Sequence, residues 1–210
     1  MPSPSPSSVF INCPFDEKYL ELFRPLVFTV LAMDLKPRFA LERANSGEQR
    51  IHKIIQLIRE SAFGIHDLSR CKASKKGEFY RMNMPLELGY DLGARAFGGK
   101  KFASKKVLIL EEEQYTIQKA ASDLAGCDCA FHANDPKKVV RVVRNWLVQE
   151  AGGSSKIAAN SIWESFNYFM GWIYDDLKAK NWSADDIALI EINELKDRMD
   201  GWLRSNPIKE

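Results

Sequence analysis

The sequence predicts an α/β protein with a five-stranded parallel sheet, followed by an α-helical hairpin. Short apolar runs alternate five times with amphipathic segments between Val9 and Glu150. Beyond the pair Gly152-Gly153, which is typical of a boundary, only helical patterns follow. The 210 residues are 45% hydrophobic and 28% charged, a composition that can bury a core of this size.

The first half of the chain alternates strand and helix patterns. Strand patterns are short apolar runs, whereas the helices show apolar residues every three or four positions. The capping sequence Ser46-x-x-Gln49 is expected to open the second helix. In chain order the predicted elements are a strand at 9–12, a helix at 19–35, a strand at 38–42, a helix from about 49, and a strand at 63–67.

The second half continues the same alternation. Pro85 suits the first position of a helix, because the N–H that proline lacks has no partner there. Asp135-Pro136 is expected to cap the last helix of the domain. The predicted elements are a helix at 85–97, a strand at 106–111, a helix at 115–124, a strand at 129–132 and a helix ending at 148. Five such units favour a flavodoxin-like strand order.

Three segments are therefore expected. Residues 1–8 are a Ser/Pro-rich arm predicted to be disordered, residues 9–150 form the α/β domain, and residues 151–210 form the helical hairpin. Capping sequences at Ser161-x-x-Glu164 and Ser183-x-x-Asp186 are expected to begin the two helices of the hairpin. The hairpin is rich in aromatic residues, so it either packs on the α/β domain or also forms a homo-oligomer interface through residues 155–204.

Charge and cysteine content restrict the class of protein. The formal net charge is +2, which makes a nucleic-acid partner unlikely but allows a single nucleotide. No apolar stretch is long enough for a membrane span, and no export signal is recognisable, so we expect a cytoplasmic protein with reduced cysteines. The cysteines are Cys13, Cys71, Cys127 and Cys129, and their spacing predicts no metal site.

Polar residues follow the strands that should flank the ligand site. In open parallel sheets, ligands bind beyond the carboxyl ends of the strands where the strand order reverses. Asn12-Cys13-Pro14-Phe15-Asp16 follows the first strand, and His66-Asp67 ends the third. Glu87 should lie in the first turn of the next helix, where free N–H groups and the helix dipole would keep a carboxylate ionised.

Several common catalytic motifs do not occur in the sequence. The first strand is not followed by Gly-x-Gly-x-x-Gly, which disfavours a dinucleotide-dependent oxidoreductase. The Gly-x-x-x-x-Gly-Lys-Ser/Thr sequence of P-loop enzymes is absent, as is the Gly-x-Ser-x-Gly turn of esterases. The sequence therefore disfavours redox, nucleoside-triphosphatase and esterase activities.

One combination of residues resembles a known superfamily. It comprises Asn12-Cys-Pro-Phe-Asp16, the strand-end Asp67, and Asn83-Met-Pro-Leu-Glu87-Leu-Gly89 with a second glycine at Gly93. Residues 9–150 resemble the superfamily that joins nucleoside 2-deoxyribosyltransferases with Toll/interleukin-1 receptor (TIR) domains. More narrowly, they resemble bacterial TIR-like proteins of antiphage defence loci. The first strand departs from the deoxyribosyltransferases, because it lacks their Gly- and Tyr-rich turn.

The resemblance implies a flavodoxin-like enzyme that cleaves the N-glycosidic bond of a nucleotide. It implies that Glu87 is the catalytic carboxylate and that Asp67 helps to hold the sugar. The residues it places at the substrate are Asn12, Pro14, Phe15 and Asp16, with Cys13, His66 and Asn83 as further candidates. NAD would be a substrate and no cofactor is implied.

Three functions remain open at this point. The first is an NAD nucleosidase, whose nicotinamide leaving group is already cationic and needs no strong general acid. The second is a nucleoside 2-deoxyribosyltransferase or hydrolase, which would need a proton donor such as the acid form of Asp67. The third is a non-catalytic module that senses nucleotides or mediates TIR interactions.

Overall fold

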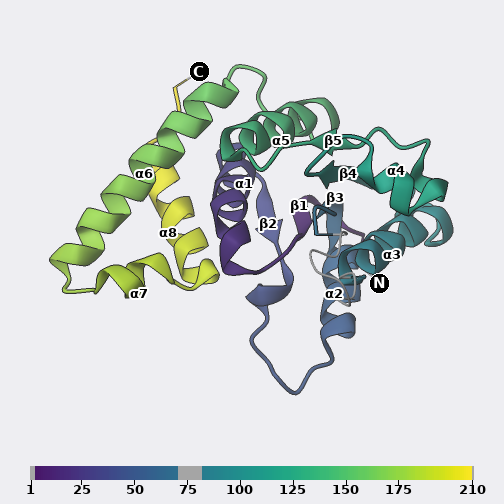
Figure 1. The fold of residues 1–210 in the computed structure, drawn as a ribbon, viewed down its shortest axis with the longest axis horizontal. Coiled ribbons are helices and arrows are strands. Elements are labelled where there is room, and N and C mark those ends of the chain that lie inside the picture. Colours follow the sequence, from purple (N-terminus) through teal and green to yellow (C-terminus); the bar gives the residue numbers. More distant parts are fainter. Residues whose placement is uncertain (1–2, 71–81, 210) are drawn as a thin grey trace.

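A computed structural model, which describes residues 3–70 and 82–209, has a five-stranded parallel sheet at its centre (Figure 1). The strand order is β2-β1-β3-β4-β5, so the predicted flavodoxin-like order is confirmed. Asn12 pairs with His66 at the ends of β1 and β3, and Asp67 pairs with Leu110 of β4. The strands are β1 (Ser5–Asn12), β2 (Lys36–Arg38), β3 (Ser61–Asp67), β4 (Lys106–Glu111) and β5 (Ala130–Phe131).

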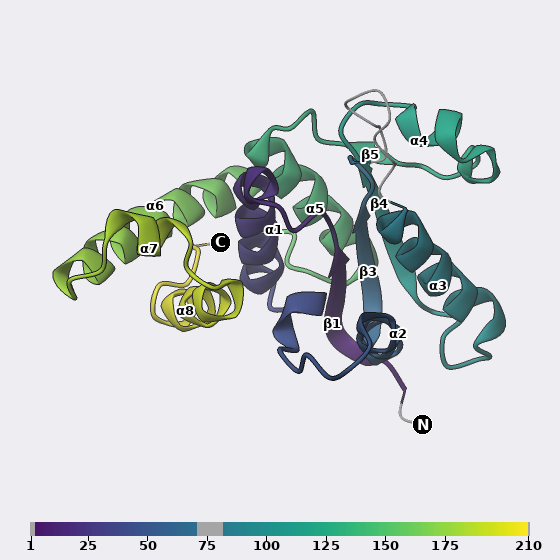
Figure 2. The same ribbon diagram turned by 60° about the horizontal axis from the view of Figure 1, so that its bottom comes forward.

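Helices cover both faces of the sheet (Figure 2). One face is covered by α1 (Leu20–Ala32) and α5 (Pro136–Glu150), and the other by α2 (Arg50–Glu60) and α3 (Asn83–Phe97). The short α4 (Thr116–Ala120) follows β4. Because α1 and α3 leave β1 and β3 on opposite faces, a crevice is expected between the carboxyl ends of these two strands.

The C-terminal extension contains three helices, where the sequence predicted two. They are α6 (Ala159–Ala179), α7 (Ala184–Ala188) and α8 (Ile192–Ser205). The predicted second helix is interrupted because the side chain of Glu191 accepts hydrogen bonds from Asn193 N and Glu194 N and so starts a new helix. The predicted capping box Ser183-x-x-Asp186 is present, whereas Ser161 lies inside α6 and caps nothing.

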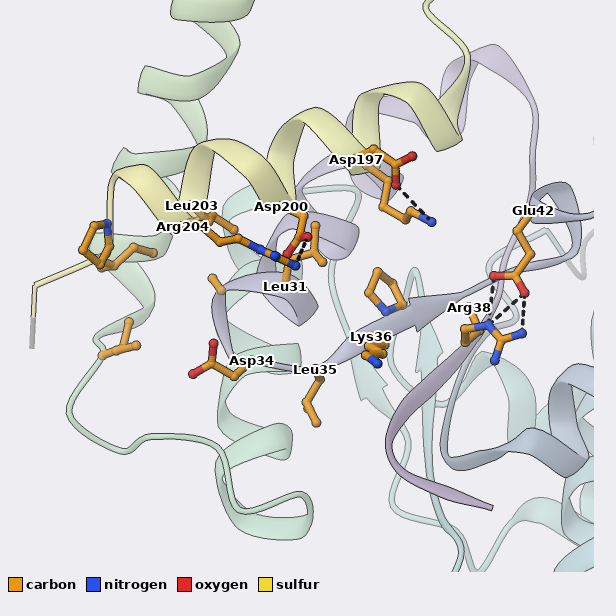
Figure 3. Close-up of a pocket in the computed structure, with 16 residues that line it drawn as sticks. Leu31, Asp34, Leu35, Lys36, Arg38, Glu42, Asp197, Asp200, Leu203 and Arg204 are labelled. Carbon is orange, nitrogen blue, oxygen red and sulfur yellow. Dashed lines mark hydrogen bonds and ion pairs between the residues drawn. The ribbon is translucent and has the colours of Figure 1, made fainter. Parts of the chain in front are cut away.

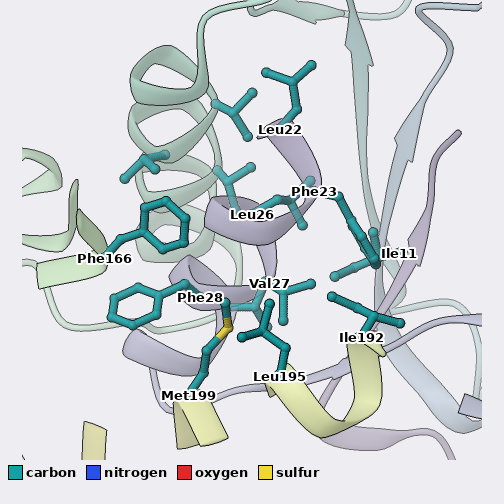
Figure 4. Packing of buried hydrophobic residues seen from close by; sticks show 14 of the residues in the cluster. Ile11, Leu22, Phe23, Leu26, Val27, Phe28, Phe166, Ile192, Leu195 and Met199 are labelled. Carbon is teal, nitrogen blue, oxygen red and sulfur yellow. The ribbon is translucent and has the colours of Figure 1, made fainter. Parts of the chain in front are cut away.

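The extension and the α/β domain share one hydrophobic core (Figure 4). The ring of Phe28 on α1 lies 5.5 Å from Phe166, 5.9 Å from Phe169 and 6.2 Å from Trp202, measured between ring centroids. The sheet contacts α1 on one side and α6 and α8 contact it on the other, so this helix is buried almost all round. The extension therefore forms a fourth layer of the same folded unit, outside α1.

The main differences from the predicted element boundaries lie in β1, in β2 and in the helix predicted at 115–124. β1 begins at Ser5, so residues 5–8 of the expected disordered arm belong to the sheet, and Ser5 pairs with Ser61. Proline is tolerated at position 6 because the register shifts between Ser5 and Val9, where no ladder N–H is required. β2 ends at Arg38, and residues 40–42 of the predicted strand form a 3₁₀ turn. The predicted helix at 115–124 is divided after Ala120.

Within residues 3–70 and 82–209, no helix combines the length and the apolar character that crossing a bilayer requires. Cys71 lies outside the residues that the structure describes.

Candidate active site

Glu87 lies in a different environment from the one predicted. α3 begins at Asn83 with Met82 as its N-cap, so Glu87 is the fifth helical residue and lies in the second turn. The side chain is 5% exposed, and no hydrogen-bond donor reaches it from the described part of the chain. Burial raises the pKa of Glu87 to about 7, against a smaller opposing effect of the positive charge of Arg50. Free helix N–H groups therefore do not hold Glu87 ionised.

Three carboxylates lie near the thiol of Cys13 at the carboxyl edge of β1 and β3, and their charges affect its pKa. The thiol is buried, and burial is the main cause that raises its pKa well above the ordinary value. The negative charges of Asp67, Glu87 and Asp16 raise this pKa further. Cys13 is therefore a protonated thiol and a poor nucleophile. The same charges create a negative potential, which stabilises positive charge that develops nearby.

Asp67 is fully buried, and its carboxylate accepts several hydrogen bonds. Ser69 N donates to Oδ1 at 2.8 Å, and the hydroxyls of Ser69 and Tyr19 also donate. His132 Nε2 lies 3.0 Å from Oδ2. Burial alone would raise the pKa of Asp67, but the contacts with His132, Ser69 and Tyr19 lower it below the usual value. Asp67 is therefore an anion that organises the site, and it is unsuited to the role of proton donor.

The neighbouring Ser69, His132 and Asp67 resemble a nucleophilic triad in composition only. Asn134 N–H donates to His132 Nδ1 at 3.1 Å, so the neutral ring carries its hydrogen on Nε2. Ser69 Oγ and Asp67 Oδ2 both face that same Nε2, at 2.8 and 3.0 Å. In a working triad the carboxylate binds one ring nitrogen and the hydroxyl the other. The histidine therefore cannot act as a base toward Ser69 in this arrangement.

Asn12 and His66 form a second buried network beneath the edge. Asn12 Nδ2 donates to Met84 O at 2.9 Å and to His66 Nδ1 at 3.0 Å. His66 Nε2 then lies 3.1 Å from Asp91 Oδ2, and Lys105 Nζ lies 3.1 Å from Asp91 Oδ1. Asn12 is 2% exposed and His66 is fully buried, so neither faces a ligand directly. Both side chains are therefore part of this buried network, and their predicted role at the substrate stays a prediction.

The other predicted substrate residues are divided between core and surface. Pro14 is buried, and Phe15 packs edge-to-face on Phe23 with 5.3 Å between ring centroids. Asp16 accepts a hydrogen bond from Tyr19 N at 3.1 Å and lies 3.7 Å from Arg70. Asn83 is exposed at the start of α3. Asp16 and Asn83 are therefore the members of the predicted set that are most accessible to a ligand.

Sequence reasoning missed the partners of both networks. Tyr19, Ser69 and His132 surround Asp67, while Asp91 and Lys105 continue the network from His66. Two signals could have identified some of them. Ser69 follows Asp67 at the spacing of an Asx turn, and Asp91 lies four residues after Glu87 on the same helical face. His132 could have been found from the strand order, which brings the end of β5 to the same edge.

The structure also contains a cavity of about 800 Å³ between α8 and the outer side of β2 (Figure 3). Its charged side chains form ion pairs, including Arg38 with Glu42 and Arg204 with Asp200. This cavity lies away from Glu87 and Asp67, which do not line it. Among the described residues, no group of three or more His, Cys, Asp or Glu side chains is arranged to hold a metal ion.

Comparison of the chain with protein-family models, curated proteins and solved structures returns no match.

Proposed function

We propose that the protein is an NAD glycohydrolase that uses Glu87 as its catalytic carboxylate. The observation that carries the proposal is the state of Glu87, which is buried at the carboxyl edge of the sheet without a described hydrogen-bond donor. Because its pKa is about 7, this carboxyl exchanges its proton near neutral pH. The sequence resemblance described above supports the same residue.

The chemistry follows from the charges at the site. The bond between the ribose C1′ and the nicotinamide nitrogen breaks, and its electron pair moves to the pyridinium ring, which leaves as neutral nicotinamide. Positive charge then develops on the ribose, and ionised Glu87 and the neighbouring Asp16 and Asp67 stabilise it. Water forms the new bond at C1′, and its proton passes to Glu87 and then to solvent. The products are ADP-ribose, nicotinamide and a proton.

The state of Asp67 favours NAD over a deoxynucleoside. Cleavage of a deoxynucleoside leaves a poorer leaving group, which needs protonation. The hydrogen bonds that Asp67 accepts lower its pKa, so it does not supply that proton at neutral pH. NAD needs no such donor because its leaving group is cationic before the bond breaks. We also propose a role in antiphage defence, and the support for it is the sequence resemblance to TIR-like proteins.

The decisive experiment is a product assay with matched variants. Wild-type protein, Glu87→Gln and Glu111→Gln are each incubated with NAD, and the products are separated by chromatography. Glu111 is a suitable control because it is a buried carboxylate that caps Tyr115 N and Ile117 N, at 2.8 and 2.9 Å. We expect nicotinamide and ADP-ribose from wild type and Glu111→Gln, and a loss of about 10³-fold or more in Glu87→Gln.

Other products would contradict the proposal in identifiable ways. A parallel incubation contains a deoxynucleoside and a free base. Base exchange without NAD cleavage would identify a deoxyribosyltransferase. Nucleotide binding without any product, across a range of protein concentrations, would identify a non-catalytic module. NAD cleavage that survives in Glu87→Gln would refute the assignment of the carboxylate.

Self-association through residues 155–204 remains a proposal. The outer side of α6 exposes Tyr168 and Trp172, and a groove of about 470 Å³ lies between them and Trp202 on α8. Exposed aromatic residues of this kind are enriched in protein interfaces. Light scattering should show a dimer or larger species that Tyr168→Ala with Trp172→Ala reduces. A monomer at every concentration tested would refute this part of the proposal.

A further inference from the structure

Glu87 lies between two points at which α3 is held by buried polar contacts. The buried residues of α3 are Met84, Glu87, Leu88 and Asp91, which share one face of the helix. The first contact is at Met84, whose carbonyl accepts a hydrogen bond from Asn12 Nδ2 at 2.9 Å. The second is at Asp91, one turn beyond Glu87, where His66 Nε2 and Lys105 Nζ each approach to 3.1 Å.

These two contacts are parts of one chain of interactions. Asn12 uses its two amide hydrogens for Met84 O and His66 Nδ1, so the neutral His66 ring carries its hydrogen on Nε2. That hydrogen is donated to Asp91. Every side chain in the network, from Asn12 to Lys105, is at most 2% exposed. Among the described residues, Asp91 Oδ1 has no hydrogen-bond partner and is held by the ion pair with Lys105. This buried ion pair and the hydrogen bonds of Asn12 and His66 together restrict where Met84 and Asp91 can lie.

The far end of the network is attached to a different part of the fold. Lys105 Nζ donates to Ile58 O at 2.8 Å and also to Ser61 O, at the junction of α2 and β3. The backbone beneath the network leaves no spare room, because a Cβ at Gly64 would lie 2.3 Å from Asp91 Oδ2 and 2.9 Å from His66 Nε2. The network therefore connects β1, β3 and the loop before β4 to α3.

We propose that the network of Asn12, His66, Asp91 and Lys105 holds the first two turns of α3 and thereby positions Glu87 for the reaction. We class these four as positioning residues, because their side chains are at most 2% exposed and contact one another within the network. The expected effect on kcat rests on the proposed function. The statement that the network holds α3 in place does not. A displacement of about 1 Å at a catalytic group can reduce a rate about 10²-fold.

The test compares Asn12→Ala with a control variant that lies outside the site. Phe28→Leu alters the core between α1 and α6, and does not touch α3 or its network. For each protein we would measure kcat and KM for NAD. The pKa of Glu87 would be followed by carboxyl ¹³C NMR. Asn12→Ala should lower kcat about 10²-fold, with KM changed by less than about threefold. It should also shift the Glu87 titration toward ordinary glutamate values, because water then reaches the loosened turn.

The outcomes separate this inference from the proposed function. If Asn12→Ala matches Phe28→Leu in both kcat and titration, the inference is overturned although NAD cleavage stands. A lower kcat with an unchanged titration also overturns it, since Asn12 would then act on the substrate itself. If wild type cleaves no NAD, the titration and amide exchange of residues 84–91 still decide whether the network holds α3. Should Asn12→Ala fail to fold, Asn12→Ser provides the same comparison, because a single hydroxyl cannot donate to both acceptors.

Discussion

Glu87 and Asp91 are buried one turn apart on the same face of α3, yet their surroundings are opposite. Asp91 is fully buried between His66 and Lys105, each 3.1 Å away. Glu87, at the edge of the sheet, has no donor within the described residues, and its pKa is raised to about 7. Burial is therefore not what distinguishes a structural carboxylate from a candidate catalytic one. The difference is whether the fold provides partners for the charged form.

The comparison predicts the largest loss of stability at Asp91. Asp91→Ala would leave Lys105 and His66 buried without their common partner. We expect the free energy of unfolding to fall by about 3–5 kcal/mol in urea denaturation at pH 7. Lys105→Met added to Asp91→Ala should recover part of this loss, because the unpaired buried charge is then removed. A loss below about 1 kcal/mol in the single variant would show that the network contributes little.

The same comparison predicts a gain of stability at Glu87. The native pKa of about 7 exceeds the ordinary value of 4.5, so the native state binds the proton more tightly than the unfolded state does. Wild type therefore loses stability as pH rises from about 4.5 through about 7. Glu87→Gln should be more stable than wild type by up to about 3 kcal/mol at pH 8.

The pH dependence provides the control for this second prediction. At pH 4 the Glu87 carboxyl is largely protonated in both the folded and the unfolded wild type. The stability of Glu87→Gln should therefore be close to that of wild type at this pH. Glu111→Gln should instead be less stable than wild type at both pH 4 and pH 8, because Glu111 accepts two backbone hydrogen bonds. A Glu87→Gln protein that is destabilised at pH 8 would mean that Glu87 has a structural partner.

Asp67 extends the comparison to a carboxylate at the same edge as Glu87 that does have partners. Its native pKa lies below the ordinary value of 3.8, so its stabilising effect is present above that pH and is lost as pH falls through the native pKa. Asp67→Asn should cost about 1.5–3 kcal/mol at pH 7. The difference from wild type should shrink in denaturation curves recorded below pH 4. A constant difference across pH would exclude the charge of Asp67 as its source.

An exposed carboxylate gives the smallest expected effect. Asp200 pairs with Arg204 one turn away on α8, at 2.5 Å, and both side chains are well exposed. Solvent and salt screen such pairs. Asp200→Ala should change the free energy of unfolding by less than about 0.5 kcal/mol. A larger change in urea denaturation would show that α8 depends on this pair.

Local residue patterns predicted most of the strands of the sheet, and the five alternating units favoured its strand order. β4 matches its predicted bounds, and β1 and β3 end at the predicted Asn12 and Asp67. Apolar runs between amphipathic segments identify buried parallel strands, because such strands are covered on both faces. The fourth layer, formed by the C-terminal extension, was partly predictable as well. α1 carries apolar residues on both sides, including Phe28, and a helix with one buried face does not need them.

Tertiary structure decided the state of each candidate residue. The sequence indicated Glu87, Asp67, Asn12 and His66 as candidates. It could not show that, among the described residues, several donors would reach Asp67 and none would reach Glu87. Those donors come from positions far apart in the chain, such as Tyr19 and His132. Local pattern encodes periodicity and turns, whereas a pKa depends on burial and on partners that only the folded chain brings together. The sequence by itself therefore determined the fold class and the edge of the sheet where the candidate residues lie. The assembled fold decided that Glu87 is buried at this edge without a hydrogen-bond donor from the described residues.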